Sequence, residues 1–373
     1  MRYVLMAVFV LAVTFLTTKY LIFALNRAFP QTARHKWLHL LLTVAVLGLV
    51  FLGSERRIVG TLTQRYVSYA VYLLFVFLLV FFVYGVFVEF FVLLRRLFPG
   101  MYERELSVVR RRLIFFVLSA ISLFTVSVGM YSMQDVSVTR LELHSPKISQ
   151  PTRVVQLSDL HFSSIIDEDF ARMVVRLTNA QKPDLIVMTG DYVDPGVISP
   201  DRVTEEMNKL EAPLGKYGIS GNHEFYTGYG EAMDFIEKNG FITLRNERAA
   251  VGRNIVLFGV DDRAAENITG GSIRSEIEVL NGSKAENYNI FLKHRPEIED
   301  GYEEHFDLML SGHTHGGQIF PLAIAAAIAN RYFIGRYTLD NASTIFVSKG
   351  TGAWGPPIRF AASPEIIVID LLP

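Results

Sequence analysis

One stretch in the first third of the chain is too long and too apolar for a water-exposed helix. It runs from Val67 to Val88 without a charged residue, and about 20 apolar residues in a helix cross a ~30 Å hydrocarbon core. Three further stretches have a similar composition, and a hydrophobic fraction of 50% agrees with them. We therefore expect a transmembrane region over residues 1–131 with about four helices, at 3–25, 37–53, 67–92 and 113–131. The chain would be a multi-pass integral protein of the cell membrane.

Two of these stretches leave an alternative open. The first contains Lys19, whose amine would have to reach the lipid headgroups, and it could instead be a cleaved signal peptide. No convincing cleavage site of small residues follows it, however. The second stretch is short and contains His39. It could be a buried helix that does not cross the membrane.

Basic residues in the loops predict the orientation, because short loops rich in Lys and Arg stay in the cytoplasm. Span four is followed by no Lys or Arg until Arg140, whereas the loop before it carries Arg95, Arg96, Arg104, Arg110, Arg111 and Arg112. This asymmetry predicts that the C-terminal domain is extracytoplasmic. The second loop favours the opposite orientation through Arg56, Arg57 and Arg65.

From about residue 135 the pattern changes to short β-branched runs that alternate with amphipathic stretches. This alternation is typical of an α/β domain, here residues 132–373. We expect strands at 136–143, 153–157, 184–188, 217–220, 254–260, 288–292, 307–310, 344–347 and 365–369. Helices are expected at 167–180, 201–210, 229–239 and 272–280.

Five of the predicted strands are followed directly by candidate metal ligands. The sequences are Asp-Leu-His at 159–161, Gly-Asp at 190–191, Gly-Asn-His-Glu at 221–224, His294, and Gly-His-Thr-His at 312–315. Loops at strand ends are where α/β folds place their chemistry. The chain has no cysteine, so the ligands are oxygen and imidazole, which suit Mn, Fe or Zn better than a hard Ca or Mg site. There are enough of them for two divalent ions.

In this order the motifs resemble the calcineurin-like metallophosphoesterase superfamily, over roughly residues 150–370. The tail resembles a membrane-linked subgroup of transmembrane metallophosphoesterases and UDP-diacylglucosamine pyrophosphatases, through residues 316–318, 350–352 and 357–365. The resemblance implies a four-layered αββα sandwich with a dimetal site at its strand ends. One ion would then bind Asp159, His161 and His315, the other Asn222, His294 and His313, and Asp191 would bridge both.

The chemistry of such a site assigns further roles. Two ions lower the pKa of a shared water, whose hydroxide is the nucleophile, so Asp191 is a catalytic residue as well as a ligand. His223 is the expected proton donor, unless it merely begins a helix. Asp194 and Glu224 would orient ligands. Asp194-Pro195-Gly196 replaces the Asp-Arg-Gly of the related protein serine/threonine phosphatases, which disfavours a phosphoprotein substrate.

Two features close to the site have more than one interpretation. The segment Ile319–Ile334 is strongly apolar and would enter the bilayer, line an acyl-chain pocket or form an ordinary buried helix. Arg359 and Arg331 are candidates for binding a substrate phosphate, since guanidinium groups suit phosphate oxygens. Surface salt bridges are the alternative for both arginines.

Together these features predict hydrolysis of a phosphoester or pyrophosphate in a lipid or cell-envelope precursor. The expected partners are the lipid bilayer and a phosphorylated, possibly lipid-linked substrate. A net charge of −1 gives no reason to expect nucleic acid. One alternative is a tethered phosphodiesterase with a soluble substrate, and another is a metal-binding regulatory or sensor domain. A metal-free scaffold would be expected to lack ligands, and the sequence retains them all.

Overall fold

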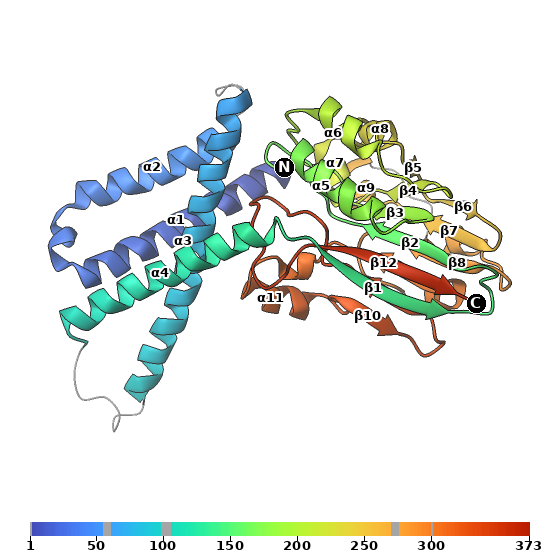
Figure 1. The fold of residues 1–373 in the computed structure, drawn as a ribbon. Helices are drawn as coiled ribbons and strands as arrows, with labels where there is room; N and C mark the ends of the chain where they lie inside the picture. The colour runs from blue at the N-terminus through green and yellow to red at the C-terminus, as the bar shows by residue number, and fades with distance from the viewer. Residues whose placement is uncertain (1, 55–60, 98–105, 270–275, 300) are drawn as a thin grey trace. The chain divides into compact units, whose positions relative to one another are not determined.

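The computed structural model describes residues 2–54, 61–97, 106–269, 276–299 and 301–373. The chain divides into two compact units, Met1–Val128 and Gly129–Pro373. The first unit is helical and the second is an α/β unit, and both are drawn in Figure 1. Among the arginines used to predict the orientation, Arg56, Arg57 and Arg104 lie outside the described residues.

The first unit is built of long apolar helices. They are α1 (Arg2–Ala28), α2 (Lys36–Ser54), α3 (Thr61–Leu97) and most of α4 (Val108–Ser132), with the short 3-10 helix η1 (Pro30–Arg34) between the first two. Within the described residues, three segments are long and apolar enough to cross a membrane: Val10–Ala28, Arg65–Leu94 and Val108–Ser132. They correspond to the first, third and fourth predicted spans. Helix α2 covers the second, for which crossing remains a prediction.

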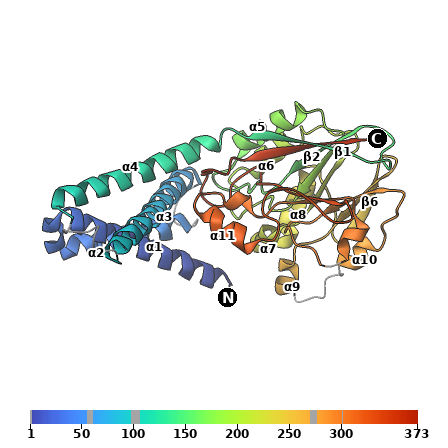
Figure 2. The same cartoon turned by 90° about the horizontal axis from the view of Figure 1, so that it is seen from below.

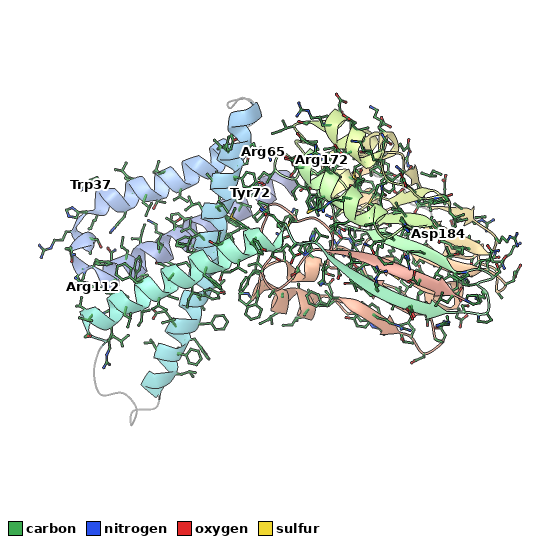
Figure 3. The ribbon with its side chains drawn as sticks, in the orientation of Figure 1. Trp37, Arg65, Tyr72, Arg112, Arg172 and Asp184 are labelled. Atoms are coloured by element: carbon green, nitrogen blue, oxygen red, sulfur yellow. The ribbon has the colours of Figure 1, made fainter. Side chains whose placement is uncertain are left out.

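Three charged groups within the apolar helices have partners. Arg27 of α1 forms an ion pair with Glu89 of α3, which lowers the cost of placing either charge in an apolar surrounding. The Lys19 amine lies 5.2 Å from the centre of the Phe15 ring, a cation–π contact on the same helix. Trp37 of α2, and Tyr72 of α3, are labelled in Figure 3.

The second unit contains two six-stranded sheets. The first has the order β1-β12-β2-β3-β4-β5 and the second β10-β11-β9-β8-β7-β6. The strands of the first sheet are β1 (Ser137–His144), β12 (Glu365–Leu372), β2 (Thr152–Leu157), β3 (Leu185–Thr189), β4 (Lys216–Ile219) and β5 (Ile242–Thr243). Those of the second are β10 (Gly335–Thr338), β11 (Thr344–Val347), β9 (Leu308–Ser311), β8 (Tyr288–Leu292), β7 (Ile255–Gly259) and β6 (Glu247–Val251).

Three apolar clusters give this unit its layers. Side chains of both sheets share the central cluster, among them Val187 and Leu292. The outer face of the first sheet is covered by α5 (Glu168–Asn179), α6 (Pro200–Met207) and α8 (Tyr229–Lys238). A third cluster covers the second sheet with residues from α10 (Glu276–Leu280) and the 3-10 helix η3 (Tyr302–His305). The predicted four-layered αββα sandwich is confirmed, and Figure 2 shows it from below.

The covering helices form where the sequence has a helical period. Helix α5 buries Ala171, Val174, Val175 and Thr178, a spacing that places them on one face, and Asp167 caps its start by accepting from the Asp169 N–H. Arg172, an exposed residue of the same helix that is labelled in Figure 3, has its Nε atom 3.2 Å from Glu206 Oε1 of α6. Asp184, also labelled there, lies just before β3 and accepts from the Arg153 N–H at 2.7 Å.

The predicted strands are all present within a residue or two, apart from the C-terminal strand, which continues to Leu372. The sequence pattern did not predict β5, β6 and β10, or the helices α7 (Asn222–Thr227) and α9 (Ala264–Thr269). Helix α11 (Leu322–Ala329) lies within the segment Ile319–Ile334, for which a helix was one expectation. Of the helix expected at 272–280, residues 272–275 lie outside the described residues, and α10 covers the rest.

Candidate metal centre

The candidate ligands follow strands that run in parallel within each sheet. In the first sheet β2 pairs with β3 and β3 with β4 in parallel, and in the second sheet β8 pairs in parallel with β9. The carboxyl ends of parallel strands meet at one edge of a sheet. Each of the five strand-end motifs therefore delivers its side chains to the same region.

The first group of donor atoms comprises Asp159, His161, Asp191 and His315. The Nε2 atoms of His161 and His315 are 3.1 Å apart, and His315 Nε2 is 3.3 Å from Asp159 Oδ1. Two ligands of one ion at metal–nitrogen distances of about 2.1 Å and a right angle would be about 3.0 Å apart. The spacing of this buried group thus fits donors around a single cation.

The second group comprises Asp191, His294 and His313. His294 Nε2 is 3.1 Å from both Asp191 Oδ2 and His313 Nδ1. The same Asp191 oxygen is 3.7 Å from His161 Nε2 in the first group. Asp191 is therefore the residue that the two groups share, in the place where the resemblance expects a bridging ligand.

Asn222 reaches the second group through Arg295, a residue that the sequence analysis did not single out. The Arg295 guanidinium donates to Asn222 Oδ1 at 3.2 Å and lies 3.0 Å from His313 Nε2. Buried Asp262 holds it, at 2.8 Å from Arg295 Nε. The Arg295 side chain remains 16% exposed, so a partly accessible cation lies at the edge of the centre. Its position directly after His294 was the available signal in the sequence.

The ligand loops have an unusual backbone. Left-handed φ values of 50° to 69° occur at Asp159, His161, Asp191, His313 and His315, a region that residues other than glycine seldom adopt. Such conformations persist where the surrounding structure enforces them, and they gather at functional sites. Glycines give the loops room: a Cβ on Gly221 would collide with Asp191 Oδ1, and one on Gly312 with Asp159 Oδ2.

Asp194 lies between two histidines. Its Oδ1 atom is 3.1 Å from His161 Nδ1 and 2.5 Å from His223 Nδ1. Since His161 Nε2 faces the first group, Asp194 fixes this ring in the way that carboxylates commonly orient metal-binding histidines. His161, Asp194 and His223 also form a cluster of possible ligands, but Asp194 Oδ1 and His223 Nδ1 lie closer together than the about 3.0 Å expected of two ligands on one ion.

His223 lies beside both groups at the start of α7. Its backbone N–H donates to Asp191 Oδ1 at 2.9 Å. The centre of its ring is 4.7 Å from that of His161 and 6.0 Å from that of Trp354. Burial acts to lower the pKa of His223, but the charges of Asp194 and Asp191 outweigh it and raise the pKa to about 9. Because Nδ1 faces Asp194, Nε2 is the ring atom that can donate a proton to a substrate.

Glu224 acts on the backbone and not on a histidine ring. One carboxylate oxygen accepts from the N–H groups of Tyr192 at 2.7 Å and Val193 at 3.2 Å. The other accepts from Asp191 at 3.0 Å and Gly221 at 2.6 Å. This fully buried side chain therefore joins the loop of the shared Asp191 to the loop that carries Asn222.

The expected substrate role of Arg359 is wrong. The side chain is fully buried, and its guanidinium donates to the carbonyls of His315 and Lys349 at 2.8 and 2.6 Å. It also lies 3.0 Å from His315 Nδ1, so it supports a candidate ligand from behind and cannot meet a substrate. Arg331 is exposed, and its guanidinium lies 5.3 Å from the centre of the Tyr332 ring.

The electrostatics of the centre favour positive charge. Burial acts to lower the pKa of His294, but the charges of Asp191 and Asp159 outweigh it and raise the pKa to about 10. Burial also acts to raise the pKa of Asp191, yet the neighbouring His294 and His223 hold it well below the usual value. Burial and the neighbouring His294 lower the pKa of His313 to about 2, so this ring is unprotonated, as a metal-binding imidazole must be.

Comparisons with known proteins agree with this site. Residues 152–317 match the calcineurin-like phosphoesterase family. An uncharacterized metallophosphoesterase of Aquifex aeolicus is 34% identical over 254 residues, which cover 66% of this chain and 97% of that protein. A Danio rerio protein named transmembrane protein with metallophosphoesterase domain is 33% identical over 237 residues, covering 61% of this chain and 54% of that one.

Among solved structures, a dimetal phosphatase from Danio rerio superposes with a TM-score of 0.34 at 13% identity, covering 54% of this chain and 88% of that one. The sequence relatives decide the assignment. The chain belongs to the calcineurin-like phosphoesterase family. It is a metal-binding phosphoester hydrolase whose α/β domain follows apolar helices of a membrane protein.

Proposed function

We propose that the chain binds two divalent ions, with Mn, Fe or Zn as candidates, and hydrolyses a phosphoester or pyrophosphate in a lipid or cell-envelope precursor. The observation that carries this proposal is the position of Asp191 between two sets of donor atoms. Asp159, His161 and His315 would complete one ion's set, and Asn222, His294 and His313 the other's. Ions held there would supply Lewis-acid stabilisation of the phosphoryl oxygens and an activated water.

The chain's own residues supply the remaining groups. His223 is oriented by Asp194 through Nδ1, which leaves Nε2 to protonate the leaving oxygen. Arg295 is held by Asp262 beside the second set of donors. A guanidinium in this place can bind a phosphate oxygen and meet the charge that grows on it during the reaction.

The membrane part of the proposal rests on the apolar helices. Candidate spans at Val10–Ala28, Arg65–Leu94 and Val108–Ser132 would hold the centre close to a bilayer, where lipid-linked phosphates are concentrated. The arginine bias of the loops favours an extracytoplasmic domain in the cell membrane. A substrate made in the cytoplasm would then have to cross the bilayer before cleavage.

Purified full-length chain in lipid nanodiscs tests the proposal with two classes of substrate. Bis(p-nitrophenyl) phosphate reports the metal chemistry, and a diacylated phosphate or pyrophosphate reports the preference for lipid. We expect Mn-supported hydrolysis of both, loss of both with a chelator, and a higher kcat/KM for the lipid substrate. Metal-dependent cleavage with no higher kcat/KM for the lipid substrate would instead identify a tethered enzyme with a soluble substrate.

A further inference from the structure

Exposed apolar side chains in the α/β unit are concentrated beside the metal centre. Among residues that the structure describes after Met133, seven large apolar side chains are exposed, and six of them lie between positions 320 and 354. We call these six the apolar patch: Phe320, Leu322, Ile324, Ile328, Ile334 and Trp354. The seventh, Ile242, lies on the short edge strand β5. Exposed apolar patches that are contiguous mark sites of interaction.

Helix α11 forms the main part of this patch and has no polar side. Its sequence is Leu-Ala-Ile-Ala-Ala-Ala-Ile-Ala, and none of its eight residues, all within the described chain, is buried. Ile324 is 51% exposed and Ile328 is 83% exposed. The interpretation of this segment as an ordinary buried helix is therefore excluded. A helix that is apolar all round normally lies in a core or in a membrane.

The patch is attached closely to the metal loops. Gly317 of the 3-10 helix η4 (His315–Gly317) packs against Ala323 of α11 so tightly that a Cβ there would collide with the Ala323 backbone. The Thr314 hydroxyl donates to the Phe333 carbonyl at 2.7 Å. Trp354 is held through Gln318, whose side-chain Oε1 accepts from the Trp354 backbone N–H at 2.9 Å. Whatever covers the patch thus lies close to the candidate ligands His313 and His315.

Charge around α11 indicates the chemistry of the partner. Arg331 and Arg336 are both exposed just after the helix, and no Asp or Glu occurs between Asp307 and Asp340. Basic side chains beside an apolar helix suit anionic lipid headgroups. A protein groove would cover one side of α11 and leave the other in water, whereas hydrocarbon can contact the whole exposed surface.

We propose that α11 and its neighbouring apolar side chains dock in the interface of the bilayer that holds the chain's own spans. Ile324 and Ile328 enter the acyl region while Arg331 and Arg336 remain among the headgroups. This inference rests on the proposed function only in that it brings the metal centre to the lipid surface. It names the element by which a lipid-linked phosphate would be presented to the ligands.

The absence of cysteine from the sequence allows a single-site probe on the full-length chain. Ile328→Cys places an environment-sensitive fluorophore on the patch, and Ile242→Cys places it on an equally apolar but separate position. Both proteins are reconstituted in phosphatidylcholine and phosphatidylglycerol vesicles, with or without bromine on the acyl chains. The Ile328 label should lose roughly half of its emission in brominated vesicles, since interfacial helices are buried about 5–10 Å into the headgroup and acyl boundary.

The Ile242 label should keep its emission in both kinds of vesicle. An Ile328 label that stays water-like and unquenched would overturn the proposal. So would a label with apolar emission that bromine fails to quench, because protein and not lipid would then cover the helix. Hydrolysis of bis(p-nitrophenyl) phosphate by the unlabelled wild type is measured separately. Its absence would contradict the proposed function while leaving the quenching result intact.

Discussion

Replacing Glu224 with Gln tests how the protein holds the shared ligand Asp191. The carboxylate accepts four backbone N–H groups, two on each oxygen. A Gln side chain has nearly the same shape, but its NH₂ group faces two of those donors whichever way the amide turns. Two charge-assisted hydrogen bonds are lost, each contributing about 1.5–3 kcal/mol, so the loop is destabilised by roughly 3–6 kcal/mol.

Both candidate ions depend on this loop, and 3 kcal/mol corresponds to a change on the order of 100-fold in an equilibrium constant. Titration of the metal-free protein with Mn, followed by calorimetry, should show both affinities reduced by at least about that factor. Activity at limiting metal should fall with them and recover in part at excess metal. Glu231→Gln on the exposed face of α8 is the matched control. Normal metal affinity in the Glu224→Gln variant would refute the proposal that Glu224 holds the Asp191 loop in place.

Three further changes separate the other roles. His223→Asn should keep its metal content while turnover falls by about 10² to 10⁴, with a smaller loss for nitrophenyl esters; loss of an ion would make His223 a ligand. Arg295→Ala should weaken inhibition by inorganic phosphate by roughly 10- to 100-fold at normal metal content, whereas Arg263→Ala should leave it unchanged. The double substitution Ile324→Ser and Ile328→Ser should impair cleavage of long-chain lipids more than cleavage of nitrophenyl esters, because each buried methylene group contributes about 0.8 kcal/mol to lipid binding. Equal losses would contradict a lipid role.

The sequence predicted those parts of the fold that have a strong local pattern. Strands such as β3 and β8 are buried along their whole length and read as continuous apolar runs. The missed strands β6 and β10 lie at the edges of the second sheet and expose polar side chains, Glu247 and Arg248 in β6 and Arg336 and Thr338 in β10. Their composition therefore resembles that of loops. Helix α7 begins at Asn222 within a ligand motif and is too short to show a period.

The strand-end motifs also predicted which side chains gather around Asp191, because a parallel sheet brings its strand ends to one edge. They could not predict contacts made across the two sheets. Arg359 was expected to face a substrate and instead lies buried behind His315, while Arg295 was overlooked although it reaches Asn222. An arginine at a surface and an arginine that binds carbonyl groups look alike in sequence. Only the path of the loops distinguishes them.

The central claim is that one carboxylate serves two ions. Metal content per chain, measured by mass spectrometry on full-length protein after loading with Mn and removal of free metal, tests it most directly. The wild type should hold two ions, and Asp191→Ala should lose both together with activity, because the two donor sets share this residue. Asp234→Ala, at an exposed position on α8, should still hold two. Two bound ions and normal activity in the Asp191 variant would contradict the account.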